Sequence, residues 1–178
     1  MIKSLARALA ALNANVKREQ LAAGFAFGVL FALLPAGNLL WLALFVATLF
    51  LKVNYAMQVL AALILSPFRL LLGSALDALG WAVLNTPFLA GPFTALYNAP
   101  IAPLTRFNNS VVMGGLVAGL ALWLPLFLAM RAFVSLYRAK LAPRIARSKA
   151  YKAFLKLPLV GSLAKAAKAV SGATGGLK

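Results

Sequence analysis

The sequence predicts an all-α integral membrane protein whose helical segments are interrupted at proline. Residues 21–51 form an apolar run without a charged residue. Hydrophobic residues make up 63% of the 178-residue chain, and its mean hydropathy is +0.92, well above that of soluble domains. Basic residues gather at both ends of the chain. We therefore expect a membrane domain at residues 19–137, between an interfacial helix at residues 1–18 and a basic cytoplasmic tail at residues 138–178.

The first 18 residues are expected to form an amphipathic helix. Apolar side chains recur there at helical spacing, and basic side chains occupy other parts of the helical wheel. The apolar positions are Ile2, Leu5, Leu9, Leu12 and Val16. Such a helix either lies in the cytoplasmic interface, where its basic residues meet anionic head groups, or packs on the membrane domain.

The apolar run of residues 21–51 is expected to break in its middle. A membrane crossing takes about 20 helical residues, so the run is too long for one straight helix and each half is too short to cross. Pro35 disfavours helix continuation, Gly37 permits a left-handed turn, and Asn38 is a good N-cap. These three signals predict that one helix stops and another starts at this point.

Residues 53–89 repeat this plan with a break at Pro67. Paired interrupted segments are an indicator of a central site in transporters. Asn85-Thr86-Pro87 and Gly91-Pro92 are then expected to end the regular structure. The proline- and asparagine-rich residues up to about 109 predict an outer loop, either irregular or with a short interfacial turn, that carries Arg106, Asn108 and Asn109. Residues 110–137 form the plainest transmembrane helix of the chain.

Charge placement predicts that both termini are cytoplasmic. Between residues 20 and 130 the only basic residues are Lys52, Arg69 and Arg106. Three simple crossings would put the basic tail outside, so one segment must be re-entrant. The preferred hairpin is residues 21–51, which leaves Lys52 on the cytoplasmic side. The alternative is a kinked crossing there and a re-entrant segment at residues 53–89.

Glycines mark two surfaces for close helix packing, either inside the protein or against a partner subunit. They are Gly24 and Gly28 in the first segment, and Gly114, Gly115 and Gly119 in the last one.

Arg69 and Asp77 are candidate functional residues, because ionisable groups at membrane depth are costly. On a continuous helix they would lie about 12 Å apart along the axis and about 80° apart around it, so they do not pair simply. Their alternative partners are Lys52 for Asp77, a phospholipid head group for Arg69, or water in a cavity. Arg69 could also extend to a nearby interface. Asn38 completes this set of lipid or cavity candidates.

Composition argues against several function classes. The chain has no Cys, no His and two acidic residues, so it offers no usual zinc cluster and no paired carboxylates for acid and base catalysis. We expect no enzyme and no cofactor other than a bound phospholipid. No interleaved aromatic residues provide a stacking platform for nucleic acid. The expected partners are membrane lipids, with anionic inner-leaflet lipids at the basic tail.

Four short patterns resemble the bacterial membrane family named domain of unknown function 2062, or a close sister family. They are residues 20–28 (QLAAGFAFG), Pro35-x-Gly37, Lys52-x-Asn54 and Ser66-Pro67. Similar members have Asn where Ser66 stands here. The resemblance covers roughly residues 19–80.

The resemblance implies a protein of the bacterial inner membrane. Members of the sister group are often encoded beside a large envelope protein that looks similar to bridge-like lipid-transfer proteins. On this basis we expect an inner-membrane subunit of an envelope complex, which anchors such a protein and passes phospholipid to it. The alternative is a self-contained small transporter or lipid scramblase that acts as a homo-oligomer.

Overall fold

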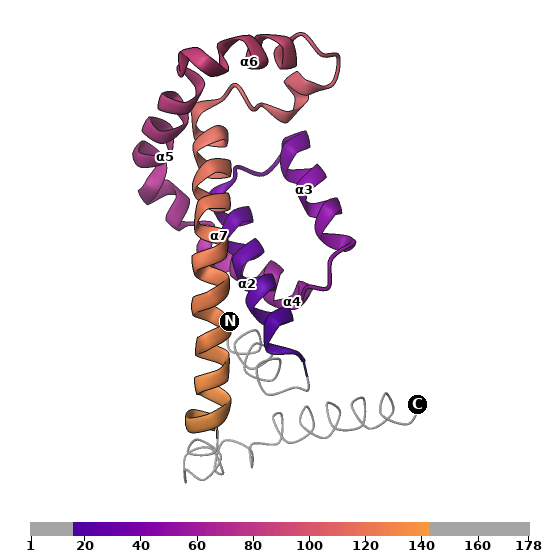
Figure 1. Cartoon of the computed structure of the whole chain (residues 1–178), viewed down its shortest axis with the longest axis vertical. Coiled ribbons are helices and arrows are strands. Elements are labelled where there is room, and N and C mark those ends of the chain that lie inside the picture. The colour runs from indigo at the N-terminus through magenta and orange to yellow at the C-terminus, as the bar shows by residue number, and fades with distance from the viewer. Residues whose placement is uncertain (1–15, 143–178) are drawn as a thin grey trace. The chain divides into compact units, whose positions relative to one another are not determined.

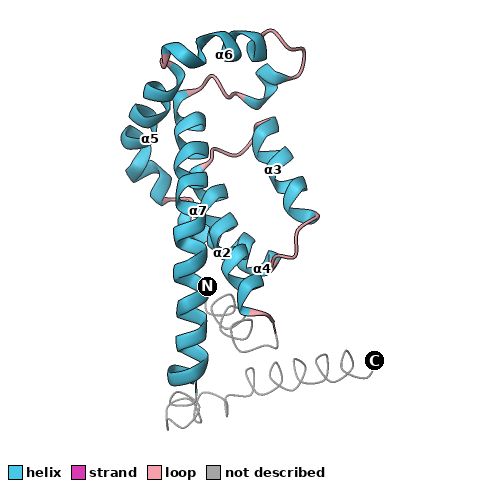
Figure 2. Ribbon diagram, in the orientation of Figure 1, coloured by secondary structure: helices cyan, strands magenta, loops and turns pink. Residues whose placement is uncertain are grey.

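The computed structural model describes residues 16–142, which form helices and loops without any strand (Figure 2). This confirms the all-α class for these residues. The chain divides into two units, residues 1–135 and residues 136–178. The predicted amphipathic helix before residue 16 and the basic tail after residue 142 lie outside the described residues.

The first predicted break separates α2 (Arg18–Leu33) from α3 (Leu39–Leu49). Gly37 has a φ of 87°, in the left-handed region that favours glycine. The Asn38 side chain accepts a hydrogen bond from the Trp41 amide at 2.8 Å and donates one to the Pro35 carbonyl at 2.7 Å. Asn38 therefore closes the turn on one side and caps α3 on the other.

α2 and α3 form a hairpin. In Figure 1, α3 returns toward the end of α2 at which the hairpin began. The Asn54 amide, just beyond α3, donates to the carbonyl of Gln20 in the first turn of α2 at 3.0 Å. The junction that carries Lys52 thus lies beside the N-terminal end of α2.

α4 (Tyr55–Leu65) packs along α2 through the two small residues that the sequence indicates. A Cβ atom at Gly24 would overlap the Asn54 carbonyl, and one at Gly28 would overlap Ala61. Since Gly24 meets the start of α4 and Gly28 meets its later turns, the two helices run parallel. This glycine pair is filled by a helix of the same chain.

The second predicted break lies between α4 and α5 (Phe68–Leu84), at Ser66 and Pro67. The two helices are bent by 82° at this break. Pro67 has helical angles and stands immediately before α5, where a missing backbone donor removes no intrahelical hydrogen bond.

The expected loop before residue 110 is largely helical, which corrects the sequence prediction. It contains the 3-10 turns η1 (Pro87–Leu89) and η2 (Ala102–Thr105), with α6 (Ala90–Tyr97) between them. Gly91 and Pro92 do not end the helical structure but lie in the first turn of α6. Amides there have no intrahelical acceptor, so proline is tolerated.

α7 (Ser110–Leu136) contacts both α2 and α5 through glycine. A Cβ atom at Gly114 would overlap the Leu76 carbonyl of α5, whereas one at Gly115 would lie 2.6 Å from the Leu33 carbonyl of α2. A Cβ atom at Gly119 would meet Leu30, one turn earlier on α2. α7 therefore runs antiparallel to α2. In the second unit the described residues include a π-helical turn, η3 (Tyr137–Leu141).

Within the described residues, one helix, Ser110–Lys140, is long enough and apolar enough to cross a membrane. The bent pair α4 and α5 passes the same criterion only if it is taken as one broken span.

Two glycines of α5 provide a matched test of the helix contacts. A Cβ atom at Gly80 would overlap the Ser110 backbone, whereas one at Gly73 meets nothing within 4 Å. We expect Gly80→Ala to lower the free energy of unfolding by about 1–3 kcal/mol through overpacking. Gly73→Ala should raise it by about 0.5–1 kcal/mol, since alanine favours helix. Thermal unfolding of both variants in detergent, followed by circular dichroism, measures this. Equal effects would contradict the contact.

Candidate functional site

Arg69 connects the two breaks. Its Nη1 donates a hydrogen bond to the Leu34 carbonyl oxygen at 3.1 Å. Leu34 is the C-cap of α2, so its carbonyl has no acceptor role inside that helix. Arg69 lies in the first turn of α5 and is half-buried. The interruption of the first segment and that of the second therefore meet at one charged side chain.

An open groove of about 560 Å³ lies between the tip of the hairpin and the turn η2. One wall comes from the start of α3 and the residues before it, and the other from residues 103–106. The groove is lined by Gly37, Asn38, Leu39, Trp41, Leu42, Pro103, Leu104 and Arg106. The structure thus brings Asn38 and Gly37 of the first break together with Arg106 of the expected outer loop.

Asp77 and Lys52 lie at opposite ends of α7. The Ser110 hydroxyl at the start of α7 donates to Asp77 Oδ1. Lys52 belongs to the junction beside the first turn of α2, where Glu19 meets Arg131 of α7. Ser110 and Arg131 are about 31 Å apart along the axis, at about 1.5 Å per residue. The expected alternative of Lys52 as the partner of Asp77 is therefore wrong.

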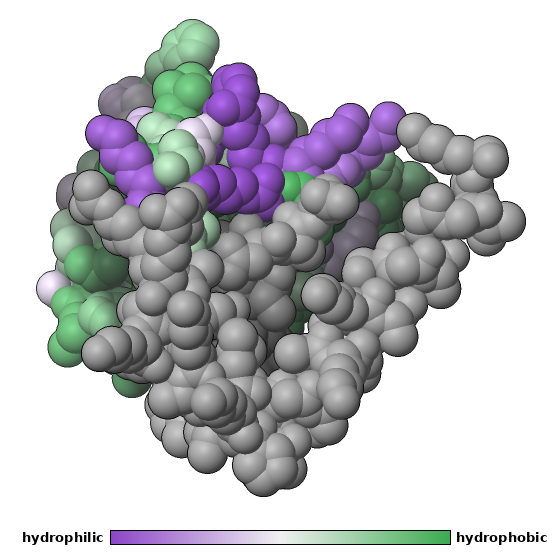
Figure 3. All heavy atoms as spheres, turned by 90° about the horizontal axis from the view of Figure 1, so that it is seen from below, coloured by the Kyte–Doolittle hydropathy of each residue, from purple (hydrophilic) through white to green (hydrophobic). Residues whose placement is uncertain are grey.

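Charged side chains gather at the Lys52 end of α7. Figure 3 shows this face, on which strongly hydrophilic residues form a purple area. Glu19 Oε1 accepts one hydrogen bond from Arg18 Nε at 2.9 Å and lies 3.5 Å from Arg131 Nε. The hydrogen bond from Arg18 holds the pKa of the Glu19 carboxyl below its ordinary value. Arg18 also donates to the Ser135 hydroxyl at 2.8 Å. Lys17 and Lys52 are exposed at this end, which leaves a net positive surface.

The remaining outer-loop candidates have different places. The Asn109 side chain accepts from the Val112 amide at 3.1 Å and so caps α7. Asn108 is exposed. Among the described residues no group of three or more His, Cys, Asp or Glu side chains could hold a metal ion.

Sequence reasoning missed the contacts that hold α3 against α4. The Tyr55 hydroxyl lies 3.0 Å from the Leu49 carbonyl and 3.1 Å from the Leu51 carbonyl, at the end of α3. Gln58 Nε2 donates to the Thr48 hydroxyl at 3.1 Å, and both residues are fully buried. A signal existed, because Thr48 and Gln58 are isolated polar residues in otherwise apolar helices.

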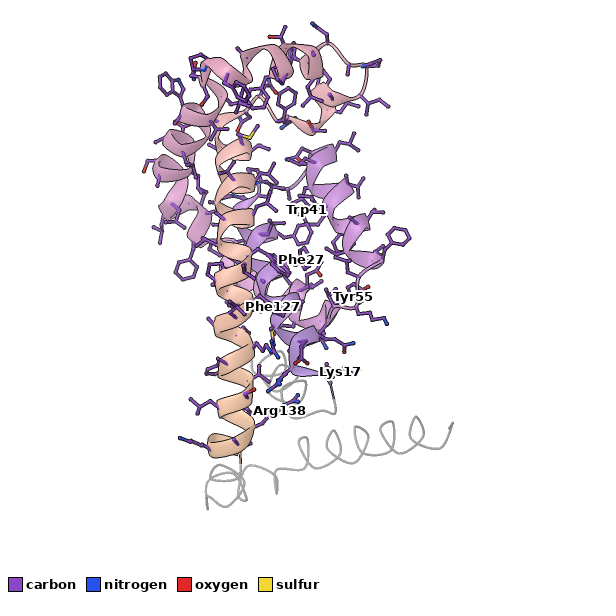
Figure 4. The ribbon with its side chains drawn as sticks, in the orientation of Figure 1. Lys17, Phe27, Trp41, Tyr55, Phe127 and Arg138 are labelled. Carbon is purple, nitrogen blue, oxygen red and sulfur yellow. The ribbon has the colours of Figure 1, made fainter. Side chains whose placement is uncertain are left out.

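Aromatic residues connect α3, α2 and α7, and the sequence analysis did not single them out. Phe31 of α2 packs edge-on against Trp41 of α3, with ring centroids 5.2 Å apart. Phe27, one turn earlier, packs in the same way against Trp123 of α7 at 5.3 Å. In Figure 4, Trp41 points from α3 toward α2, the helix that carries Phe27. The spacing of Phe27 and Phe31 by four residues was the available signal.

These features define a helical protein with a membrane-length helix and two interrupted segments that meet at their breaks. The chain is 34% identical over 145 residues to an uncharacterized protein of Treponema pallidum (strain Nichols), across 82% of this chain and 90% of that protein. At this identity and coverage, the chain belongs to the same family as that protein. No family model and no solved structure matches the chain.

The contact between Arg69 and Leu34 can be tested by substitution. We expect Arg69→Ala to lower the free energy of unfolding by about 1–2 kcal/mol, because the α2 C-cap carbonyl loses a charged donor. Arg69→Lys should recover part of this loss. Leu70→Ala is the control, since Leu70 is the adjacent residue and is 81% exposed. Denaturant titration in detergent measures all three. An Arg69→Ala variant as stable as the Leu70→Ala control would contradict the contact.

Proposed function

We propose that this chain is an inner-membrane subunit of a cell-envelope complex, which anchors a larger bridge-like protein and passes phospholipid to it. The observation that carries the proposal is the meeting of both helix breaks at Arg69, whose acceptor Leu34 precedes the groove residues Gly37 and Asn38 in the chain. Interrupted segments that meet provide polar groups inside an otherwise apolar helical protein. Such groups are needed where a lipid head group has to enter apolar surroundings.

The spacing of charged groups supports this placement in a bilayer. About 31 Å of α7 separates Ser110 from Arg131. This length is close to the thickness of a hydrocarbon core, which is about 30 Å. In the proposed orientation Glu19, Lys52 and Arg131 lie at the cytoplasmic interface. Asp77 then lies with Ser110 at the opposite interface rather than at mid-depth, where a carboxylate would be costly.

The length of α3 supports a route for lipid. Its 11 residues span about 16 Å, which is too short to cross the hydrocarbon core. The hairpin tip would therefore end inside the bilayer, on the side of the groove. Apolar side chains of α3 are exposed there, including Leu42, Val46 and Leu49. A phospholipid beside α3 could keep its chains on this apolar face while its head group approaches the groove.

The exposed apolar residues around α6 support a partner protein on the extracytoplasmic side of the membrane. Phe88 is 88% exposed, and Ile101 and Leu104 are each 64% exposed. These residues follow α5 and precede α7, beyond the hairpin tip. The resemblance noted above favours a large envelope protein as the partner. The glycine contacts of α2 and α7 are filled within the chain, so they do not favour a homo-oligomer.

Purification of the tagged chain from native membranes in mild detergent tests the partner. We expect a large protein with an extracytoplasmic domain to co-purify. Ala substitutions at Phe88 and Ile101 should reduce its recovery about tenfold, because exposed aromatic and aliphatic residues dominate such contacts. Lys52→Ala, at the opposite end, is the control and should leave recovery unchanged. If no such partner is recovered, and reconstituted chain moves labelled lipid between leaflets unaided, the scramblase alternative replaces this proposal.

Single cysteines test the orientation, since the chain has no native cysteine. Lys52 and Asn108 are both exposed and lie near opposite ends of α7. We expect Lys52→Cys to react with a membrane-impermeant maleimide only after the membrane is opened, and Asn108→Cys to react in intact spheroplasts. Labelling of Lys52→Cys in intact spheroplasts would contradict the proposed hairpin.

A further inference from the structure

Arg106 has an unneutralised charge beside an apolar groove. The whole chain contains only two acidic residues. Glu19 is engaged with Arg18 and Arg131 at the other end of α7, and Asp77 accepts from Ser110. Neither acid lines the groove. A guanidinium without a carboxylate partner is available to an anion from outside the chain.

The backbone of Arg106 has a conformation that is unusual for arginine. It has a φ of 54° and a ψ of 29°, and no other non-glycine residue in the described part of the chain has a positive φ. Asn tolerates this left-handed region better than Arg, and Asn108 and Asn109 are close by in sequence. The turn is fixed by hydrogen bonds of 3.0 Å from the Arg106 amide to Pro103 and from the Asn109 amide to Arg106. These hydrogen bonds keep Arg106 in an unfavourable conformation beside the groove.

The opposite wall of the groove also favours an anion. It contains Asn38 and Leu39, at the N-terminus of α3, where the Asn38 side chain already accepts from the Trp41 amide and the helix dipole adds a positive potential. The rest of the lining is apolar, mainly Trp41, Leu42 and Leu104. The groove thus joins one cation and a helix N-terminus to an apolar surface, as a molecule with a phosphate and an acyl chain would require.

We propose that this groove binds a phosphate group, with the Arg106 guanidinium as its ligand, and that the phosphate belongs to a phospholipid head group. This inference rests on the proposed function, because it names the position at which the transferred lipid is held. A guanidinium can bind two phosphate oxygens through two parallel hydrogen bonds. The volume of about 560 Å³ lies within the about 300–1,000 Å³ typical of small-molecule sites. Inorganic phosphate shares the same chemistry and is separated experimentally.

Binding of short-chain lipids to the purified full-length chain in detergent tests this site. The probes are dihexanoyl phosphatidylglycerol, inorganic phosphate and dihexanoylglycerol, measured by isothermal titration calorimetry. We expect the phosphatidylglycerol to bind and dihexanoylglycerol not to bind. Arg106→Gln should weaken binding about tenfold or more, because a charge-assisted hydrogen bond is lost. Arg106→Lys should weaken it less. Tighter binding of inorganic phosphate than of the lipid would overturn the phospholipid assignment.

Arg106→Gly separates binding from folding. Glycine adopts the left-handed conformation without strain, so this variant should unfold at or above the wild-type temperature and still lose binding about tenfold. Lys52→Gln removes the same charge at the opposite end and should bind as wild type does. Wild-type affinity in Arg106→Gly and Arg106→Gln would overturn the inference.

A lipid-transfer assay with the co-purified partner distinguishes the two proposals. If wild type binds the lipid probe through Arg106 but transfers nothing, the proposed function fails and the site stands. If Arg106→Gly transfers lipid at the wild-type rate, the site fails and the proposed function stands.

Discussion

The arrangement depends on contact between helix backbones at glycine. α7 reaches α5 at Gly114 and α2 at Gly115, and α4 reaches α2 at Gly24 and Gly28. Since small residues let two backbones approach closely, α2 is enclosed by α4 and α7 on different sides. That enclosure fixes the end of α2 beside the start of α5. Only then can a single arginine bridge the two breaks.

The breaks themselves were predictable, because their signals are local. Proline removes a donor, glycine permits a left-handed turn and asparagine caps the next helix. Residues 35–38 are therefore sufficient to predict the first break. Pro67 is likewise a local signal, and it predicts the second break. The glycine spacing predicted close packing, but it could not distinguish a helix of this chain from a partner subunit. That choice depends on which helices the fold brings together.

The groove and its surroundings could not be predicted from the sequence, because they join residues far apart in the chain. Arg106 and Asn38 are separated in the chain by α3, α4, α5 and α6, and nothing in their local patterns relates them. The sequence predicts a loop before Ser110, because Gly91-Pro92 is typical of a helix break. The first turn of a helix accepts this dipeptide, and a sequence pattern does not reveal where a short helix begins. The contact of Asp77 with the Ser110 hydroxyl also joins residues far apart in the chain, so the sequence does not predict this partner.

α3 is attached at three points along its length. Asn38 fixes its first turn, the Gln58 amide holds its buried Thr48, and the Tyr55 hydroxyl meets its last carbonyls. The first of these contacts is local to the turn, whereas the other two join the C-terminal half of α3 to α4. The wall of the groove formed by α3 is therefore positioned by contacts that lie outside the groove, at the far end of the helix.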